Sequence, residues 1–124
     1  MRVLLRRVLK RKYGRGRLST VTDAAELLQM RKYVEKVHVE PDVERYMVKL
    51  AATTRDFRQV VVGASPRGSL ALLKLARAWA AMQGRDYVLP DDVKHFAVPA
   101  LGHRLILAPE LWMRRGAHEA VLNE

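Results

Sequence analysis

The sequence predicts a mainly α-helical protein, a small helical bundle with up to three very short β-strands. Apolar residues recur every three or four positions in several segments, the spacing that places them on one face of a helix. Proline or a capping residue stands at the start of these segments. The 124 residues are 49% hydrophobic but only 6% aromatic, so a single domain with a core of aliphatic side chains is expected.

The central helix is predicted over 65–83, with Ser65 as the N-cap and Pro66 at the first helical position. The Ser65 hydroxyl is expected to accept a backbone N–H. Because this segment is apolar almost all round, we expect it to be buried, with Leu72 and Trp79 largely buried in the core. Other helices are predicted at 2–12, 23–36, 42–55, 91–98 and 110–123, and short strands at 37–39, 87–89 and 104–107.

Methionines lie on the apolar stripes of three of these helices and are expected to fill the core: Met30, Met47 and Met82. The segment 60–62 is expected to be a brief extended approach to Gly63. The paired carboxylates Asp91 and Asp92 follow a proline, where acidic side chains favour a helix start. They are therefore interpreted as helix-starting residues and not as a catalytic pair.

The net charge of +10 is concentrated at one end of the chain. Residues 1–17 hold eight basic side chains and no acid, which leaves fifteen basic and thirteen acidic residues in the remainder. We interpret 1–18 as a basic segment separate from a helical domain over 19–124. Such a segment can bind phosphate backbones without sequence preference, or it can be the end of a larger folded unit.

Most familiar kinds of site lack their residues in this sequence. There is no cysteine and no phosphate-binding G-x-x-x-x-G-K-[ST] loop, and no apolar run approaches the ~18–20 residues of a membrane span. No metal site is predicted, because the histidines are scattered: His38, His95, His103 and His118. We expect a cytoplasmic protein without a membrane partner, whose chain alone holds no complete catalytic site.

Arg67 is the candidate site residue that the local pattern singles out. It stands in the first turn of the central helix, where a buried element would hold its stem and leave its positive tip available for an anion. An ordinary exposed arginine in a first turn fits the local pattern as well. Lys74 lies seven residues further on and shares the same narrow stripe. Arg55, after Thr54, is expected to cap backbone carbonyls or to pair with an acid.

Several motifs in order give the chain a family resemblance. They are Val37-x-Val39, Tyr46, Thr54-Arg55, the run from Gly63 to Arg67, the run from Gly84 to Val88, Pro90-x-Asp92-Val93 and Leu101-x-His103-Arg104. Their order and spacing over roughly 19–108 resemble the C-terminal lid domain of MoxR-type AAA+ ATPases. The resemblance implies that residues 1–18 are the end of an ATPase core, or the linker out of it, and that 19–124 form the lid.

The resemblance also implies a function. In this family the arginine matching Arg67 is the sensor-two residue, which reaches the γ-phosphate of ATP bound on the large domain; Ser65, Pro66 and Lys74 would support it. The implied full-length protein is a ring-forming, chaperone-like ATPase that uses ATP and Mg²⁺. Its implied partners are its own large domain, neighbouring ring subunits and proteins with von Willebrand factor A domains. The present chain is expected neither to hydrolyse ATP nor to bind it tightly.

Two other functions stay open from the residues alone. A helical DNA-binding or histone-like module would use the basic segment 1–18, although specific nucleic-acid recognition is not expected. A plain protein-interaction bundle would bind no phosphate. Salt-dependent binding to generic DNA would favour the first, and the absence of any response to nucleotide in the full-length protein would favour the second.

Overall fold

The structure, a computed structural model, describes residues 20–123. The helix expected at 2–12 and the basic segment 1–18 lie outside these residues. The described elements follow in the order α2 (Ala24–Lys36), α3 (Pro41–Thr53), β1 (Val60–Val62), α4 (Pro66–Met82), α5 (Pro90–Leu101), the 3₁₀ turn η1 (Gly102–Arg104), β2 (Ile106–Leu107), the 3₁₀ turn η2 (Pro109–Leu111) and α6 (Ala117–Leu122). The prediction of a mainly α protein is confirmed.

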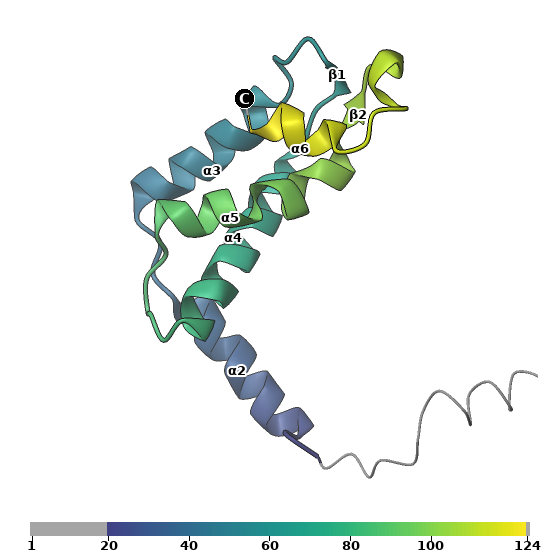
Figure 1. Ribbon diagram of the computed structural model, residues 1–124. Coiled ribbons are helices and arrows are strands. Elements are labelled where there is room, and N and C mark those ends of the chain that lie inside the picture. Colours follow the sequence, from purple (N-terminus) through teal and green to yellow (C-terminus); the bar gives the residue numbers. More distant parts are fainter. Residues whose placement is uncertain (1–19, 124) are drawn as a thin grey trace, which may run out of the picture.

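The core lies where α3, α4 and α5 pack together, with α4 in contact with both of the others and with α2 (Figure 1). Each of the three core helices buries one stripe of small or aliphatic side chains. Leu72 on α4 and Met47 on α3 are fully buried, as predicted. The remaining buried apolar side chains of these helices are Val43, Ala51, Ala76, Ala80, Val93, Ala97, Ala100 and Leu101.

The prediction that α4 is buried on nearly all sides is wrong. Only one stripe of it is buried, formed by Gly68, Leu72, Ala76 and Ala80 at every fourth position. These residues are small apart from Leu72, so α5 can approach α4 closely along a narrow strip, and the larger apolar side chains are left outside it. Leu70, Leu75 and Met82 are exposed. Apolar composition therefore overstated how much of the helix the core covers.

Three further core assignments change. Trp79 is half-buried and not largely buried, since it lies at the border of the α4–α5 contact. Its indole stacks on His95 with the ring centroids 5.0 Å apart and meets the edge of Phe96 at 5.8 Å. Met30 and Met82, expected as core fillers, are both exposed. The stripe of α2 that contains Met30 faces the end of α4 and no further layer of the described residues covers it.

The short strands are placed differently from the prediction. Segments 37–39 and 87–89 contribute a single parallel bridge between His38 and Tyr87 instead of two strands. The third predicted strand is present as β2, and it pairs antiparallel with β1, the segment expected only to be extended. Val60 lies opposite Leu107, and Val62 opposite Ile106.

The helix predicted over 110–123 is interrupted. The chain forms η2, turns, and starts α6 after Gly116, whose φ of 73° belongs to the left-handed region. Glycine adopts that conformation without the steric cost that a side chain adds. The interruption lets the short α6 lie across α5 and η1, where Ala117 and Val121 are buried (Figure 1).

Candidate functional site

Arg67 lies where the sequence predicts it, in the first turn of α4, and its side chain is exposed. No hydrogen bond or ion pair connects its guanidinium to any other residue between 20 and 123. Several other arginines of the domain are engaged within it. Arg45 pairs with Asp42, Arg55 binds a backbone carbonyl, and Arg85 binds Asp92. The five N–H donors of Arg67 are therefore available to an acceptor outside these residues.

The backbone immediately before α4 is held by the neighbouring residues Thr54 and Arg55. The buried Thr54 hydroxyl accepts the N–H of Ala64 at 2.9 Å and donates to the carbonyl of Ala51 at 2.7 Å. Arg55 donates from Nε and Nη2 to the carbonyl of Ala64, at 3.1 and 3.0 Å. Both backbone polar groups of Ala64 are thus bound by side chains that follow α3, and the start of α4 is fixed to the end of α3.

Of the two predicted alternatives, Arg55 follows the first in binding a backbone carbonyl, although this carbonyl belongs to the loop before α4 and not to the end of α3. It pairs with no acid among residues 20–123. The role of Thr54, which the sequence left open, is structural. Neither contact could be found from periodicity, because the partner Ala64 lies nine and ten residues away in a loop. The adjacency of Thr54 and Arg55 at the end of a predicted helix was the only signal.

Two glycines allow the close contacts on either side of Arg67. A Cβ on Gly63 would stand 2.8 Å from the backbone nitrogen of Arg55 and 2.9 Å from its Cα, a clash with main chain that cannot move aside easily. A Cβ on Gly68 would stand 2.9 Å from Cδ2 of Leu101 and 3.3 Å from Cβ of Ala64. The Arg67 backbone is therefore positioned by contacts to α3 on one side and to α5 on the other.

Ser65 begins α4 as predicted, but its side chain makes no capping hydrogen bond. The N–H of Gly68, one of those a capping hydroxyl would accept, donates instead to the backbone carbonyl of Ser65 at 2.7 Å. The following Pro66 has no N–H at all. The predicted bond is therefore wrong, while the extended backbone of Ser65 (φ −75°, ψ 167°) is that of an N-cap residue.

Lys74 lies further along α4 than Arg67. Seven residues separate them, which is about 10 Å along a helix axis. Lys74 instead lines a groove between α2 and α4. Among the residues expected to act together, the structure therefore keeps Ser65, Pro66 and Arg67 at one end of α4 and places Lys74 two turns away.

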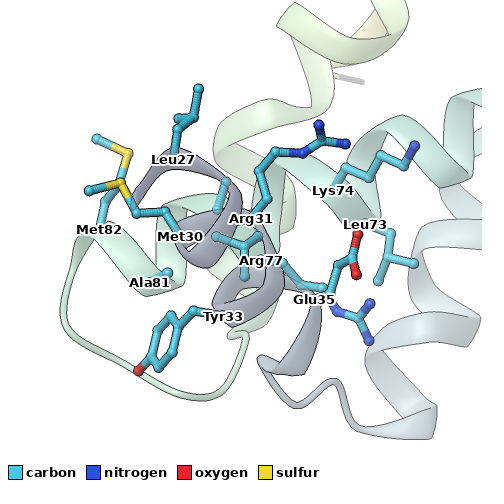
Figure 2. A pocket seen from close by; sticks show the side chains of 12 residues that line it. Leu27, Met30, Arg31, Tyr33, Glu35, Leu73, Lys74, Arg77, Ala81 and Met82 are labelled. Carbon is cyan, nitrogen blue, oxygen red and sulfur yellow. The ribbon is translucent and has the colours of Figure 1, made fainter. Parts of the chain in front are cut away.

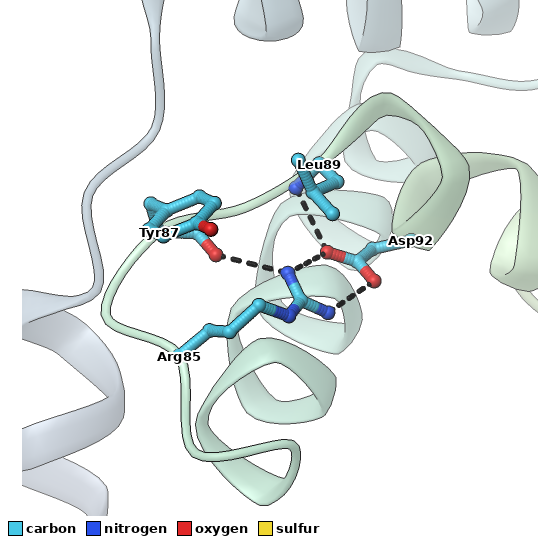
Figure 3. Close-up of polar contacts among 4 residues, drawn as sticks. All are labelled: Arg85, Tyr87, Leu89 and Asp92. Atoms are coloured by element: carbon cyan, nitrogen blue, oxygen red, sulfur yellow. Dashed lines mark hydrogen bonds and ion pairs between the residues drawn. The ribbon is translucent and has the colours of Figure 1, made fainter.

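Two further motif residues, Arg85 and Asp92, hold the connection between α4 and α5 (Figure 3). Arg85 donates from both terminal nitrogens to the carboxylate of the buried Asp92, at 2.8 and 2.7 Å. Asp92 also accepts the N–H of Leu89 at 2.8 Å, and Arg85 donates to the carbonyl of Tyr87 at 3.1 Å. The predicted helix-starting role of Asp92 is confirmed. Asp91 is exposed, and its polar contact within residues 20–123 is with Lys94.

The electrostatics of this pair favour the ionised forms. The hydrogen bonds from Arg85 lower the pKa of Asp92, against the opposing effect of burial, and the N–H of Leu89 and the positive charge of Arg85 lower it further. The hydrogen bond to Asp92 raises the pKa of Arg85. A carboxylate held in this way is committed to structure, so it is unsuited to exchange protons with a substrate near neutral pH.

His103 and Arg104, whose role the sequence left open, lie at the end of α5. The Nδ1 of His103 lies 3.1 Å from the carbonyl oxygen of Pro99, and Nε of Arg104 donates to the carbonyl of Ala100 at 3.0 Å. Carbonyls in the last turn of a helix lack partners within the helix, and cationic side chains there also suit its dipole. These residues therefore close α5.

Neither a metal centre nor a membrane span is present among the described residues. Between residues 20 and 123 the structure brings no three His, Asp or Glu side chains together in a way that could hold a metal ion. None of the helices in this range combines the length and the apolar character that crossing a membrane requires.

Comparison with known proteins gives the class to which this set of helices belongs. A family model for the AAA lid domain matches residues 52–124, and the chain belongs to this family. The solved structures agree. A chain from Cytophaga hutchinsonii to which an ATPase activity has been attributed superposes with a TM-score of 0.77 at 28% identity, over 98% of this chain and 40% of that one.

The relatives identify the kind of AAA lid. The chain is 36% identical over 107 residues to the uncharacterized protein YeaC of Bacillus subtilis, covering 86% of this chain and 33% of YeaC. It is 31% identical over 112 residues to the chaperone MoxR1 of Mycobacterium tuberculosis, covering 83% of this chain and 30% of MoxR1. The MoxR protein of Paracoccus denitrificans is 34% identical over 93 residues, and the match covers 64% of this chain and 27% of that protein. The expected MoxR-type AAA+ lid is confirmed, and the chain spans about a third of the length of these relatives.

Proposed function

We propose that this lid domain senses the nucleotide bound on an AAA+ ATPase domain and that Arg67 is the sensing residue. One observation carries the proposal: Arg67 is exposed and unengaged within residues 20–123, while the backbone on both sides of it is held to α3 and α5. When a phosphate binds an arginine whose backbone is held in this way, the contact can affect the position of the whole domain. An arginine that served only local structure would have a partner inside the domain.

The chemistry of arginine supports a phosphate as the ligand. Its planar guanidinium forms paired, charge-assisted hydrogen bonds that match the oxygens of a phosphate. Because Arg67 belongs to α4, and α4 contacts α2, α3 and α5, a contact made at its tip acts on the central helix of the lid. Gain or loss of the terminal phosphate would then change the position of the lid relative to the ATPase domain.

ATP and Mg²⁺ would be held by the ATPase domain, and this chain would add one arginine to their surroundings. Ser65 and Pro66 would set the direction of the first turn of α4. Lys74, about 10 Å further along the helix axis, would at most support Arg67 from the next turns of α4. We further propose that the complete protein assembles into a ring in the cytoplasm and remodels or matures partner proteins, including ones with von Willebrand factor A domains. The chaperone name of the MoxR1 relative is compatible with this activity.

The test is to replace Arg67 by Ala in the longer polypeptide that carries the ATPase domain. ATP turnover should fall by about tenfold or more, which corresponds to about 1.4 kcal/mol of lost transition-state stabilisation. Arg45→Ala is the matched control, since Arg45 is an exposed arginine on α3 whose partner Asp42 is equally exposed. It should leave turnover within about twofold, as a surface change does.

A second measurement separates sensing from folding. Arg67→Ala in the 124-residue chain should change the free energy of unfolding by no more than ~0.5 kcal/mol. Hydrogen exchange of α4 in the longer polypeptide should respond to a non-hydrolysable ATP analogue in the parent protein and not in Arg67→Ala. Unchanged turnover together with an unchanged exchange response would refute the assignment of Arg67.

A further inference from the structure

The first helix of the domain has an apolar side that the described residues leave uncovered. In α2 no residue is buried, and Leu27, Met30 and Tyr33 are each about half exposed. These three residues recur at intervals of three and thus lie on one side of the helix. A helix in water is stabilised mainly by packing of its apolar face, so a surface of this kind favours a further partner.

This side of α2 lies against the end of α4 and forms a groove with it (Figure 2). The groove has a volume of about 720 Å³, larger than a single side chain fills. Met82, at the end of α4, is 77% exposed and lines the groove with Leu27 and Met30. Along both helices the lining extends over nine or ten residues, from Leu27 to Glu35 and from Leu73 to Met82. This is about 13 Å of helix, enough for two turns and more of an incoming helix.

The charges that line the groove are mostly positive and lack partners. Arg31, Lys74 and Arg77 are cationic, and Glu35 is the one acidic residue. Within the described part of the chain none of the three cations forms an ion pair. Arg77 is only partly exposed, and its Nε is buried without a hydrogen-bond acceptor among these residues. A half-buried positive charge of this kind is stabilised by a carboxylate brought from outside.

We propose that the α2–α4 groove binds an acidic amphipathic helix of a partner protein. Apolar side chains at positions i, i+4 and i+7 of that helix would enter between Leu27, Met30 and Met82. Acidic side chains along its edges would face Arg31, Lys74 and Arg77. The apolar lining provides affinity, and the uncompensated positive charge selects an acidic helix over a basic one. The site is separate from Arg67 and does not depend on the proposed nucleotide sensing.

The experiment measures binding of a fluorescein-labelled peptide to the 124-residue chain by fluorescence anisotropy. The peptide is a helix-forming sequence of about 16 residues, long enough to be partly helical, with Leu at i, i+4 and i+7 and Glu on its flanks. A second peptide carries Lys in place of every Glu. The acidic peptide should bind on the order of tenfold more tightly than the basic one, and added salt should reduce the difference.

Two matched pairs of variants locate the site. Leu27→Asn, in the groove, should lower the affinity for the acidic peptide on the order of tenfold, whereas Leu28→Asn should change this affinity by less than about twofold. Leu27 and Leu28 are similarly exposed, at 52% and 55%, but only Leu27 lines the groove. Arg31→Gln should likewise weaken binding more than Lys32→Gln, since Lys32 is exposed outside the groove.

Three outcomes would overturn the proposal. Equal binding of the acidic and basic peptides, or equal effects within the two pairs of variants, would show that the groove is not the binding site of an acidic helix. A dimer of the unliganded chain that Leu27→Asn dissociates in sedimentation would assign the groove to a second copy. Failure of the acidic peptide to bind the longer polypeptide with its ATPase domain would show that the rest of that polypeptide covers the groove.

Discussion

Thr54 holds the start of the central helix through one hydroxyl group, and replacing it by valine tests this connection directly. Thr54 is 1% exposed, and its oxygen lies 2.9 Å from the backbone nitrogen of Ala64, which is itself fully buried. A valine methyl cannot accept that N–H, and it cannot stay at hydrogen-bonding distance without a steric clash. The Ala64 N–H is then left buried without a partner, or the loop before α4 moves.

The expected loss follows from the bonds removed. A buried donor left unsatisfied costs about 1–3 kcal/mol, and the bond from Thr54 to the carbonyl of Ala51 contributes about 1 kcal/mol more. Thr54→Val should therefore reduce the free energy of unfolding by about 2–4 kcal/mol, which lowers the melting temperature of a domain of this size by about 10–15 °C. Urea unfolding followed by far-UV circular dichroism measures the change.

The adjacent threonine is a matched control. Thr53 is partly exposed, and its hydroxyl donates to the carbonyl of Lys49 on the surface of the same helix. Thr53→Val makes the same chemical change one position away, but it leaves no buried group unpaired. It should cost no more than ~0.5 kcal/mol. Equal losses for the two variants would show that the Thr54 hydroxyl does not fix the start of α4.

Three further predictions concern the core, acid stability and nucleotide binding. Leu72→Ala should cost about 2–5 kcal/mol in urea unfolding, whereas Met82→Ala on the same helix should cost at most ~0.5 kcal/mol; similar values for both would contradict the assigned core. Because its pKa is lowered on folding, Asp92 adds stability above its unfolded pKa of 3.8, and this stability is lost as the pH falls through the folded value. The unfolding free energy of Asp92→Asn should thus depend less on pH between about 5 and 2, and an unchanged pH profile would exclude the effect. Calorimetry should detect no low-micromolar binding of Mg-ATP to this chain, because one arginine supplies ~1.5–3 kcal/mol and micromolar affinity needs ~8.

The helices could be predicted from the sequence because their signals are local. Pro41, Pro66 and Pro90 each stand at the first position of a helix, and the predicted bounds differ from the observed ones by a few residues at most. The interruption before α6 was missed, because a helical pattern does not show that Gly116 takes a positive φ. The pairing of β1 with β2 was also missed, since partners some 45 residues apart leave no periodic signal in so short a strand.

Burial was harder to predict than secondary structure. Composition indicated that α4 would be enclosed, yet which apolar side chains are covered depends on how many helices surround it. Met82 and Leu72 have similar hydrophobicity and opposite exposures because Leu72 belongs to the buried stripe of α4 and Met82 does not. For the candidate site, the position and exposure of Arg67 followed from its place in the first turn. The bonds that fix its surroundings came from Thr54, Arg55 and two glycines, whose contacts only the three-dimensional structure reveals.

The backbone bridge at His38 fixes one end of α2 to the rest of the domain. His38 donates its N–H to the carbonyl of Asp86 at 2.8 Å and accepts the N–H of Val88 at 3.0 Å, so the chain just after α2 is fastened to the α4–α5 connection. Val37, beside it, is buried. The 13 residues of α2 extend about 20 Å from this anchored point. A tilt of about 10° at Val37 would therefore carry Ala24 through about 3.5 Å, so a small rotation near the bridge would move the far end of α2 by about the width of an atom.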